Sequence, residues 1–446
     1  MRRSFALAYL LLAAAGCRFQ SEPKAAAGAP NVAVILIDTL RPDHLRAYGY
    51  DRETAPFLSE LAERSTVFLN AVSSSSWTAP ATASLFTGLY PNRHGVIRGF
   101  FAERKRQRQE DGGAELQINR IASEAPTMAE LFRSRGCRTF AIGANLNIGP
   151  EIGFDRGFDR FQRLGDLARA KRIGDDAPAA DVVTQLRQWR DDLRASSPYL
   201  LYLHFNDPHG PFHKREPWYS AAPPAQNPTL AAYDSEIGYV DSFIRQVYDD
   251  LGLGDGILVV VSDHGNAFGE HGKRGHGPGA GLYGVVNRIV LMISGPKHGI
   301  APQRVEVPVS IVDVLPTLLE LAGIGSPPQL AGQSLVRLLR GGEPAGDASG
   351  ERALFAHLID YGQDGDVWAV VKTPWKLIRD PDGTVLYDLA EDPGEQSDLA
   401  AQRPDIVTAL GQEIDRYLAQ SQQGESIGVG ISPAELERLR ALGYAE

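Results

Sequence analysis

The chain has 446 residues, of which 43% are hydrophobic and 22% are charged, and this composition excludes a disordered, collagenous or coiled-coil protein. Its 55 acidic and 45 basic residues give a net charge of −10, which disfavours nucleic acid as a partner. One of the two cysteines, Cys17, lies in the N-terminal leader, so the folded body retains only Cys137 and we expect no intrachain disulfide.

The first 17 residues have the layout of an export signal. Arg2 and Arg3 precede an apolar run over residues 5–15, which is too short to span a bilayer. The sequence Ala-Ala-Gly-Cys ending at Cys17 is similar to the lipidation box of bacterial lipoproteins, although Ala14 stands where Leu is usual. The alternative is an ordinary cleaved signal peptide with an incidental cysteine.

We therefore expect an exported protein, periplasmic or at the cell surface, that is anchored by a lipid on Cys17. Residues 18–30 are rich in small residues and read as a flexible tether. No later segment is apolar enough for a transmembrane helix, so the lipid would be the only membrane contact.

The chain then alternates between predicted strands and helices. Continuous apolar runs predict buried strands at residues 32–37, 139–143, 199–205 and 257–261. Helical spacing or helix-start signals predict helices at residues 56–67, 80–86, 127–134, 182–193 and 233–251. This order predicts an α/β fold with a mainly parallel sheet sandwiched by helices. The polar stretch 103–111, with its basic run, is interpreted as a solvated loop.

The pattern changes after a Gly-rich linker at residues 341–350. Short alternating segments at 367–371, 375–378 and 385–387 predict strands, and residues 405–419 predict a helix. We therefore predict a catalytic domain over residues 31–343 and a small C-terminal antiparallel α+β subdomain over residues 351–446.

Polar clusters follow three of the predicted strands. Asp38 follows the first, Asn206-Asp207-Pro208-His209 follows the strand at 199–205, and Ser262-Asp263-His264-Gly265 ends the strand at 257–261. A lone Asp at such a place is often only a turn or helix cap. Because ligands of open α/β sheets bind at the carboxyl ends of the strands, three clusters together predict a functional site. Asp with His suits borderline cations such as zinc or manganese.

Thr78 lies just before the predicted helix at 80–86, and two interpretations are open. Its hydroxyl could cap the helix, or it could be a nucleophile at a helix N-terminus, where backbone N–H groups favour an anion. A threonine hydroxyl is a weak nucleophile until a metal or a base activates it.

Together with Thr78–Gly88, Tyr233–Asp241 and residues 313–317, these motifs resemble the sulfatase family of the alkaline-phosphatase superfamily, from Asn31 to about Ala419. The family places Cys or Ser, any residue, then Pro-Ser-Arg, where this chain has Thr78, Ala81 and Thr82. The family oxidises that Cys or Ser to formylglycine, but oxidation of a threonine would give a ketone, so this route is closed. Relatives that use Thr directly are phosphodiesterases and phosphoryl transferases with a phospho-threonine intermediate.

The resemblance also implies a set of site residues. It makes Asp38, Asp263 and His264 ligands of one divalent metal, with the Thr78 hydroxyl completing the set. Zinc or manganese is favoured, with calcium as an alternative. The resemblance implies that one or two metal ions are bound. The candidate ligands of a second ion are Asp207, His209, His271 and His276.

The remaining assignments concern the substrate side. We predict Thr78 and His209 as catalytic residues and His276 and His271 as substrate-binding residues. His204 is interpreted as structural, and Arg41 is expected to order its loop.

Several functions fit this pattern. The first is a metal-dependent hydrolase of anionic phosphoric mono- or diesters, acting through Thr78. The alternatives are a sulfuric ester hydrolase without formylglycine, a phosphoryl-group transferase, and a non-catalytic binding protein on the same fold. The natural substrate and the oligomeric state are not encoded in these motifs.

Overall fold

The computed structural model describes residues 28–97, 117–164, 177–220, 227–277, 279–343, 352–360, 365–420 and 429–430. The predicted signal, Cys17, the tether up to residue 27, the polar loop 103–111 and most of the Gly-rich linker lie outside these residues. Within the described part of the chain, no helix is both long and apolar enough to span a membrane.

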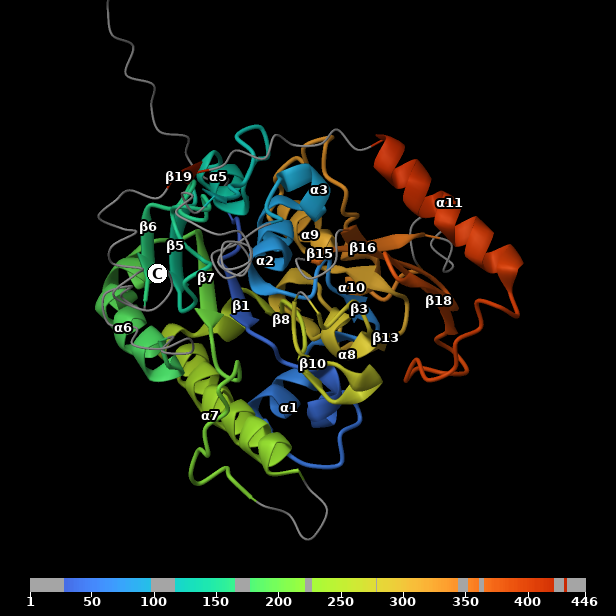
Figure 1. Cartoon of the computed structure of the whole chain (residues 1–446). Helices are drawn as coiled ribbons and strands as arrows, with labels where there is room; N and C mark the ends of the chain where they lie inside the picture. The colour runs from blue at the N-terminus through green and yellow to red at the C-terminus, as the bar shows by residue number, and fades with distance from the viewer. Residues whose placement is uncertain are drawn as a thin grey trace, which may run out of the picture.

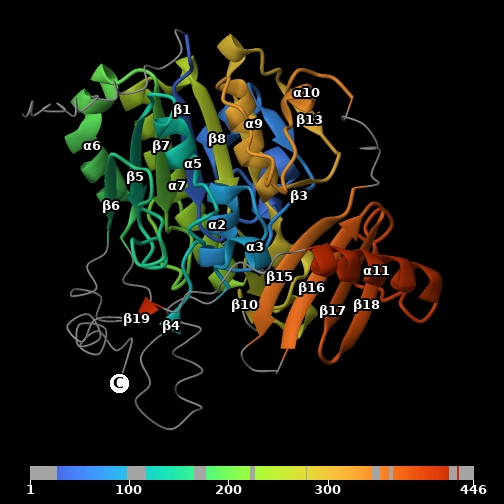
Figure 2. The same cartoon turned by 90° about the horizontal axis from the view of Figure 1, so that it is seen from above.

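A mainly parallel sheet forms the centre of the larger domain (Figures 1 and 2). Its described strands run in the order β13-β2-β12-β8-β1-β7-β5-β6, and only β12 is antiparallel to its neighbours. The strands are β1 (Val32–Ile37), β2 (Thr66–Phe68), β5 (Arg138–Gly143), β6 (Arg160–Arg163), β7 (Tyr199–Phe205), β8 (Ile257–Ser262), β12 (Leu291–Ser294) and β13 (Gln303–Val305). The predicted fold class is confirmed.

Helices cover both faces of this sheet. The hydrophobic core on one face is closed by α1 (Pro56–Ala62), α6 (Ala179–Ala195) and α7 (Pro228–Leu251). The core on the other face is closed by α2 (Thr78–Thr87), α5 (Met128–Arg133) and α9 (Val314–Leu321). Strands β1, β7 and β8 are buried throughout, which is why they read as continuous apolar runs.

A second, antiparallel sheet follows in the C-terminal region, at the side of the main domain (Figure 2). It consists of β15 (Leu354–Asp360), β16 (Gly365–Lys372), β17 (Trp375–Asp380) and β18 (Gly383–Asp388), with α11 (Pro404–Gln420) packed on it. The N–H of His357 in β15 donates to the carbonyl of Ser74 at 2.9 Å. The C-terminal sheet therefore abuts the segment that leads into α2.

Shorter elements connect these layers. They are α3 (Pro91–His94), α8 (Gly284–Asn287), α10 (Val336–Leu339), β3 (Ala71–Val72), β4 (Gln117–Ile118), β9 (Ala267–Phe268), β10 (Arg274–Gly275), β11 (Arg288–Ile289), β14 (Val309–Ser310) and β19 (Val429–Gly430).

Several predicted helix boundaries were wrong. The helix expected over 233–251 begins at Pro228, and the helix expected over 182–193 spans Ala179–Ala195. The helix expected over 56–67 ends at Ala62, because Thr66–Phe68 forms β2 between β12 and β13. The helix expected over 80–86 already begins at Thr78, so Pro80 is its third residue. The early end of α1 reflects the tertiary pairing of β2, which helical spacing cannot register.

Candidate active site

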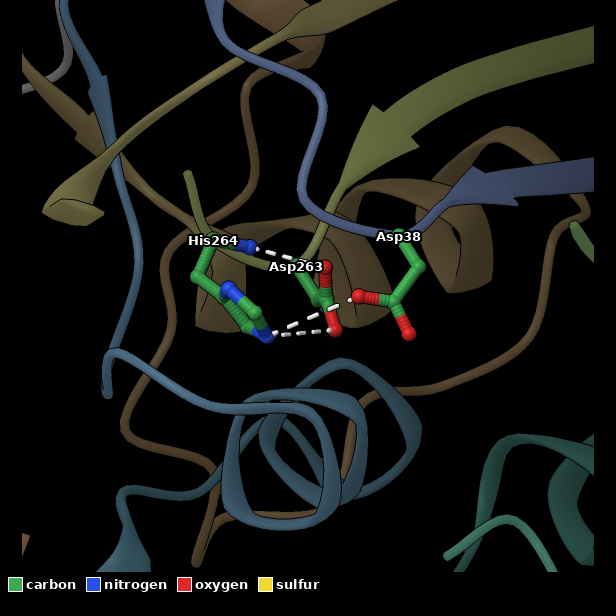
Figure 3. Close-up of side chains that lie close together, drawn as sticks. All are labelled: Asp38, Asp263 and His264. Carbon is green, nitrogen blue, oxygen red and sulfur yellow. Dashed lines mark hydrogen bonds and ion pairs between the residues drawn. The ribbon is translucent and has the colours of Figure 1, made fainter. Parts of the chain in front are cut away.

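The two carboxylates of the site lie side by side because their strands are neighbours. Ile37 is paired with Ser262 in the parallel ladder of β1 and β8, so the next residues, Asp38 and Asp263, leave the sheet together. One ligand atom each from Asp38, Asp263 and His264 lies within 4.8 Å of the other two (Figure 3). All three side chains are fully buried. The expected cluster at the carboxyl edge of the sheet is therefore formed.

The backbone after Asp38 is strained and firmly held. Thr39 has φ of 56°, in the left-handed region that a β-branched residue rarely adopts. Its N–H donates to Asp263 Oδ1 at 3.2 Å, and its carbonyl accepts from the Tyr233 hydroxyl at 2.7 Å. These two bonds stabilise the sharp turn that directs the Asp38 carboxylate toward Asp263.

His264 presents a lone pair to the carboxylates. Its Nδ1 lies 2.9 Å from the carbonyl of Gly265, and a carbonyl can only accept, so Nδ1 carries the proton. The Nε2 atom is left as an acceptor, 3.3 Å from Asp263 Oδ2 and 3.7 Å from Asp38 Oδ1 (Figure 3). This is the tautomer that a metal-binding imidazole needs.

Thr78 is the first residue of α2, and its hydroxyl enters the same cluster. The cap position belongs to Trp77, and the Thr78 hydroxyl lies 3.3 Å from both Asp38 Oδ2 and His264 Nε2. The hydroxyl therefore faces the carboxylates, and the helix-cap interpretation is wrong.

The donor set of this cluster fits a divalent cation. Two carboxylates out of contact with water are costly unless a cation compensates them. Burial raises the pKa of the Asp263 carboxyl, and among the described residues its Oδ2 has no hydrogen-bond donor. Carboxylate oxygens with one neutral imidazole suit zinc or manganese, so Asp38, Asp263 and His264 could hold such an ion beside Thr78.

A pair of half-buried histidines borders the cluster. The ring of His276 lies 4.6 Å from that of His264 and 4.9 Å from that of His209, measured between centroids. His209 Nδ1 lies 2.8 Å from the carbonyl of Gly210, so its Nε2 is again the acceptor in the neutral form. Burial lowers the pKa of His209 to about 4, and burial also lowers the pKa of His276.

The structure does not bring Asp207 to the carboxylate cluster. One of its oxygens accepts from Arg215 at 2.9 Å and the other from the N–H of Ala179 at 2.8 Å, at the start of α6. It also lies beside Glu236, whose pKa is raised to about 8, first by burial and then by the hydrogen bond to Asp207. Asp207 thus anchors its loop, and the geometry does not support its assignment as a metal ligand.

His271 is also placed elsewhere. Its ring stacks on Tyr283 at 4.0 Å with an interplanar angle of 9°. Its pKa is lowered by burial and raised in part by Glu395, which pairs with Lys376 of the C-terminal sheet. His271 therefore lies toward the C-terminal sheet, and its contacts do not support a role in binding metal or substrate.

Sequence reasoning missed Asn145, which lies two residues beyond β5 at the same sheet edge. Its Nδ2 donates to Asp38 Oδ2 at 3.0 Å and to Asn206 Oδ1 at 3.1 Å. Asp38 was singled out because it follows the carboxyl end of a predicted strand. The same search after the predicted strand at 139–143 would have found Asn145.

His204 and Arg41 have clear places. His204 is fully buried in β7 with Nε2 3.5 Å from Asp38 Oδ2, and burial lowers its pKa to about 3. Arg41 pairs with Asp43 and Glu270, each at 2.7 Å, and donates to the carbonyl of Asn266 at 2.9 Å. Arg41 orders the loop after β1, in line with its expected role.

Comparison with known proteins identifies the family. Residues 30–324 match the family model described as Sulfatase, and residues 280–423 match the C-terminal model of N-sulphoglucosamine sulphohydrolase. The chain is 24% identical to the Delta 4,5-hexuronate-2-O-sulfatase of Bacteroides thetaiotaomicron, with 95% of each chain covered. It is 27% identical to the choline-sulfatase of Rhizobium meliloti, over 84% of this chain and 83% of that one.

A solved structure agrees on the fold. The phosphonate monoester hydrolase of Agrobacterium radiobacter superposes with a TM-score of 0.71 at 20% identity, covering 91% of this chain and 100% of that one. The chain therefore belongs to the sulfatase family of the alkaline-phosphatase superfamily, whose members are ester hydrolases.

Proposed function

We propose that this protein is a metal-dependent hydrolase of phosphoric mono- or diesters that acts through a covalent Thr78 intermediate. The observation that carries the proposal is the position of the Thr78 hydroxyl, 3.3 Å from Asp38 Oδ2 and from His264 Nε2. By the resemblance, Thr78 stands at the position of the family's oxidisable Cys or Ser, and its methyl group means that oxidation would give a ketone and not formylglycine.

The chain's own residues supply the first half of the reaction. Asp38, Asp263 and His264 would hold the cation, which when bound lowers the pKa of a neighbouring hydroxyl and offsets charge on the ester oxygens. The Thr78 hydroxyl first releases its proton to solvent. Its oxygen then attacks phosphorus in line while the bond to the leaving oxygen breaks, and it departs again when phospho-Thr78 is hydrolysed. The N-terminus of α2, at which Thr78 lies, adds a favourable field for the anionic ester.

His209 is proposed as the acid and base of the reaction. In the first half it donates to the leaving oxygen, and in the second half it accepts a proton from the water that hydrolyses phospho-Thr78. The first role needs the imidazolium form. Burial lowers the pKa of His209 to about 4 in the free protein, and the negative charge of a bound ester raises that pKa again.

A sulfuric ester is the second candidate substrate. It is favoured by the names of the relatives, which include a hexuronate sulfatase and a choline-sulfatase. In that case Thr78 would attack sulfur within the same cluster. A non-catalytic binding protein is the third reading, since the chain has Ala81 and Thr82 in place of the family's Ser-Arg pair.

We further propose that the protein is exported and works in the periplasm or at the cell surface, with a lipid on Cys17 as its membrane contact. The signal-like residues 1–17 support this. The proposed partner is an anionic ester, and the net charge of −10 argues against nucleic acid.

The test is a paired assay of the purified protein. Aryl phosphate monoesters, aryl phosphate diesters and an aryl sulfate are compared with zinc, manganese, calcium or a chelator. Thr78→Ala should lose activity by about 10³-fold or more, whereas Thr78→Ser keeps the hydroxyl and should retain much of it. Mass spectrometry of quenched reactions should find the adduct on Thr78.

Each outcome is informative. Metal-dependent phosphate cleavage that is lost in Thr78→Ala supports the proposal and identifies the metal. Dominant sulfate cleavage would replace it with the second candidate. Unchanged turnover in Thr78→Ala would exclude Thr78 as the nucleophile, and a metal-loaded protein without turnover on any ester would favour the binding protein.

A further inference from the structure

Four polar residues stand in one row at the carboxyl edge of the central sheet. In the sheet, Ile142 of β5 is level with Leu203 of β7, which is level with Ile35 of β1, and β8 continues this row. Three residues farther along the chain, β8, β1, β7 and β5 are followed by Asp263, Asp38, Asn206 and Asn145. Asn145 therefore ends a row that begins at the metal-ligand candidates.

The hydrogen bonds of Asn145 fix the direction of its amide group. Its Oδ1 accepts from the backbone N–H of Asn147 at 2.9 Å, which only the oxygen of the amide can do. Its Nδ2 donates on the other side to Asp38 Oδ2 at 3.0 Å and to Asn206 Oδ1 at 3.1 Å. The residue is 4% exposed, so these bonds are shielded from water.

The first of these bonds acts on a metal-ligand candidate. Asp38 Oδ2, which accepts from Asn145, also lies 3.3 Å from the Thr78 hydroxyl. A hydrogen bond to a charged, buried carboxylate is stronger than one between neutral groups. Asn145 thus restrains the rotation of the Asp38 carboxylate beside the hydroxyl of Thr78.

The second bond acts on the turn that carries His209. Asn206 is the first residue after β7, and it is 7% exposed. Its backbone carbonyl accepts from the N–H of His209 at 2.7 Å, which closes the turn. Because Asn145 holds the side chain of Asn206, it also restrains the start of this turn.

We propose that Asn145 is a positioning residue that links the carboxylates to His209: its amide N–H groups hold Asp38 for the metal and Asn206 for the turn. The Asp38 part rests on the metal site of the proposed function, whereas the part that concerns the turn does not. Carboxylates that bind metals are commonly held by hydrogen bonds, and losing such a partner typically costs about 10–100-fold in metal affinity or activity.

The experiment measures metal binding and protection of the turn without turnover. The purified protein is stripped with a chelator and titrated with zinc or manganese by calorimetry. Amide hydrogen exchange is followed in the chelator, by mass spectrometry of peptides that cover residues 206–213. Asn145→Leu keeps a side chain of similar size and removes both donors. We expect it to weaken metal affinity by about 10-fold or more and to speed exchange in these peptides.

Asn31→Leu is the matched control. Asn31 precedes β1 at the opposite edge of the sheet, and its Oδ1 accepts from the N–H of Tyr199 at 3.1 Å, where β7 begins. Its side chain therefore joins β1 to β7, as the Asn145 amide does at the carboxyl edge. This variant should lose thermal stability and keep both the metal affinity of the wild type and its exchange rates at residues 206–213.

A third variant tests for rescue. Asn145→Gln keeps the amide donors on a side chain that is longer by one methylene group, and it should bind metal more tightly than Asn145→Leu. If Asn145→Leu does not fold, Asn145→Ala takes its place in both measurements. A folded Asn145→Gln that binds metal as weakly as the donor-free variant would contradict the role of the amide.

The outcomes separate this inference from the proposed function. If the wild type binds no metal, the metal site of the proposed function is wrong, and the exchange rates alone decide whether Asn145 holds the turn. If the wild type binds metal and the donor-free variant binds it equally well, Asn145 does not position Asp38. Unchanged exchange at residues 206–213 would exclude its hold on the turn. Equal losses in Asn31→Leu would indicate general destabilisation and overturn both parts.

Discussion

The carboxylate side of the site, with Asp38, Asp263 and His264, lies on the ends of two paired central strands. The histidine side, with His209 and His276, lies on irregular segments beyond β7 and β10. The residues of the carboxylate side are fully buried, and the pairing of β1 with β8 fixes their positions. The two histidines are half-buried. A rigid sheet edge can hold a metal in fixed geometry, whereas looser segments can adapt to different leaving groups. The two sides should therefore respond differently to mutation.

The largest expected effect is on the carboxylate side. Asp263→Asn should lower activity by about 10³-fold, because it removes a charged metal ligand. The same variant should be more stable than wild type in the chelator, since burial raises the pKa of Asp263 and the amide carries no charge. Assays and thermal unfolding with and without metal test both claims.

Asp241→Asn is the matched control for that variant. Asp241 is also buried, but it caps α1 by accepting from the N–H groups of Phe57 and Leu58 at 2.9 and 2.8 Å. It should leave the metal response unchanged. A stable Asp263→Asn that still gains stability from metal would exclude Asp263 as a ligand.

The histidine side should fail in a different way. His209→Gln should lower kcat/KM by about 10²-fold by removing proton transfer, while the metal content stays that of the wild type. A loss of metal in this variant would instead indicate that His209 holds a second ion. His271→Gln, measured alongside, tests the sequence-based substrate role: the structure predicts a much smaller loss for it than for His209→Gln.

Removing the metal should destabilise the whole domain, because the two carboxylates belong to central strands. At a metal concentration about 100-fold above Kd, binding adds roughly 2.7 kcal/mol to the free energy of unfolding. Thermal unfolding should therefore shift to lower temperature in a chelator, and the shift should be absent in Asp263→Asn. An equal shift in both proteins would place the stabilising ion elsewhere.

The smallest expected effect is on stability, and it comes from Glu236, which lies beside the Asp207 that anchors the His209 loop. The pKa of Glu236 is raised to about 8 by burial and by its hydrogen bond to Asp207, so the folded protein keeps a proton that the unfolded chain has lost. This contribution to stability is complete below the unfolded pKa of about 4.3 and disappears as pH rises through 8. We expect a loss on the order of 1–2 kcal/mol between pH 7 and 9.

Glu236→Gln should flatten that dependence, because the amide has no proton to lose. Unfolding by denaturant at several pH values measures it. Identical pH profiles of the two proteins would show that Glu236 is already ionised in the folded state. The Arg215 side chain, which pairs with both Asp207 and Glu236 at 2.9 and 3.0 Å, would then neutralise the pair.

Much of the fold could be read from the apolar runs. The strand at 199–205 was predicted with its observed ends, and the strand at 257–261 ends one residue later, at Ser262. Buried parallel strands are apolar on both faces, so their composition alone marks them. The short strands β2 and β12 were missed, because three or four residues carry too little periodicity.

The site was predicted as far as strand ends identify it. Asp38, Asp263 and His264 come together because β1 and β8 are adjacent, and Thr78 joins them because α2 begins above that edge. Asp207 and His271 have the same residue types and similar motif positions, yet Arg215 and Tyr283 hold them elsewhere. Residue type and spacing do not reveal which partner a side chain meets.

The sequence by itself determined the order of the long buried strands and of the helices between them, the ligand types at the strand ends and the loss of the formylglycine precursor at Thr78. Only the tertiary structure decided which of these residues meet, how His264 and His209 direct their lone pairs, and that His204 and Asn145 surround Asp38. The physical reason is that local preference is written along the chain, whereas strand adjacency and the direction of a buried side chain depend on contacts between residues far apart in it.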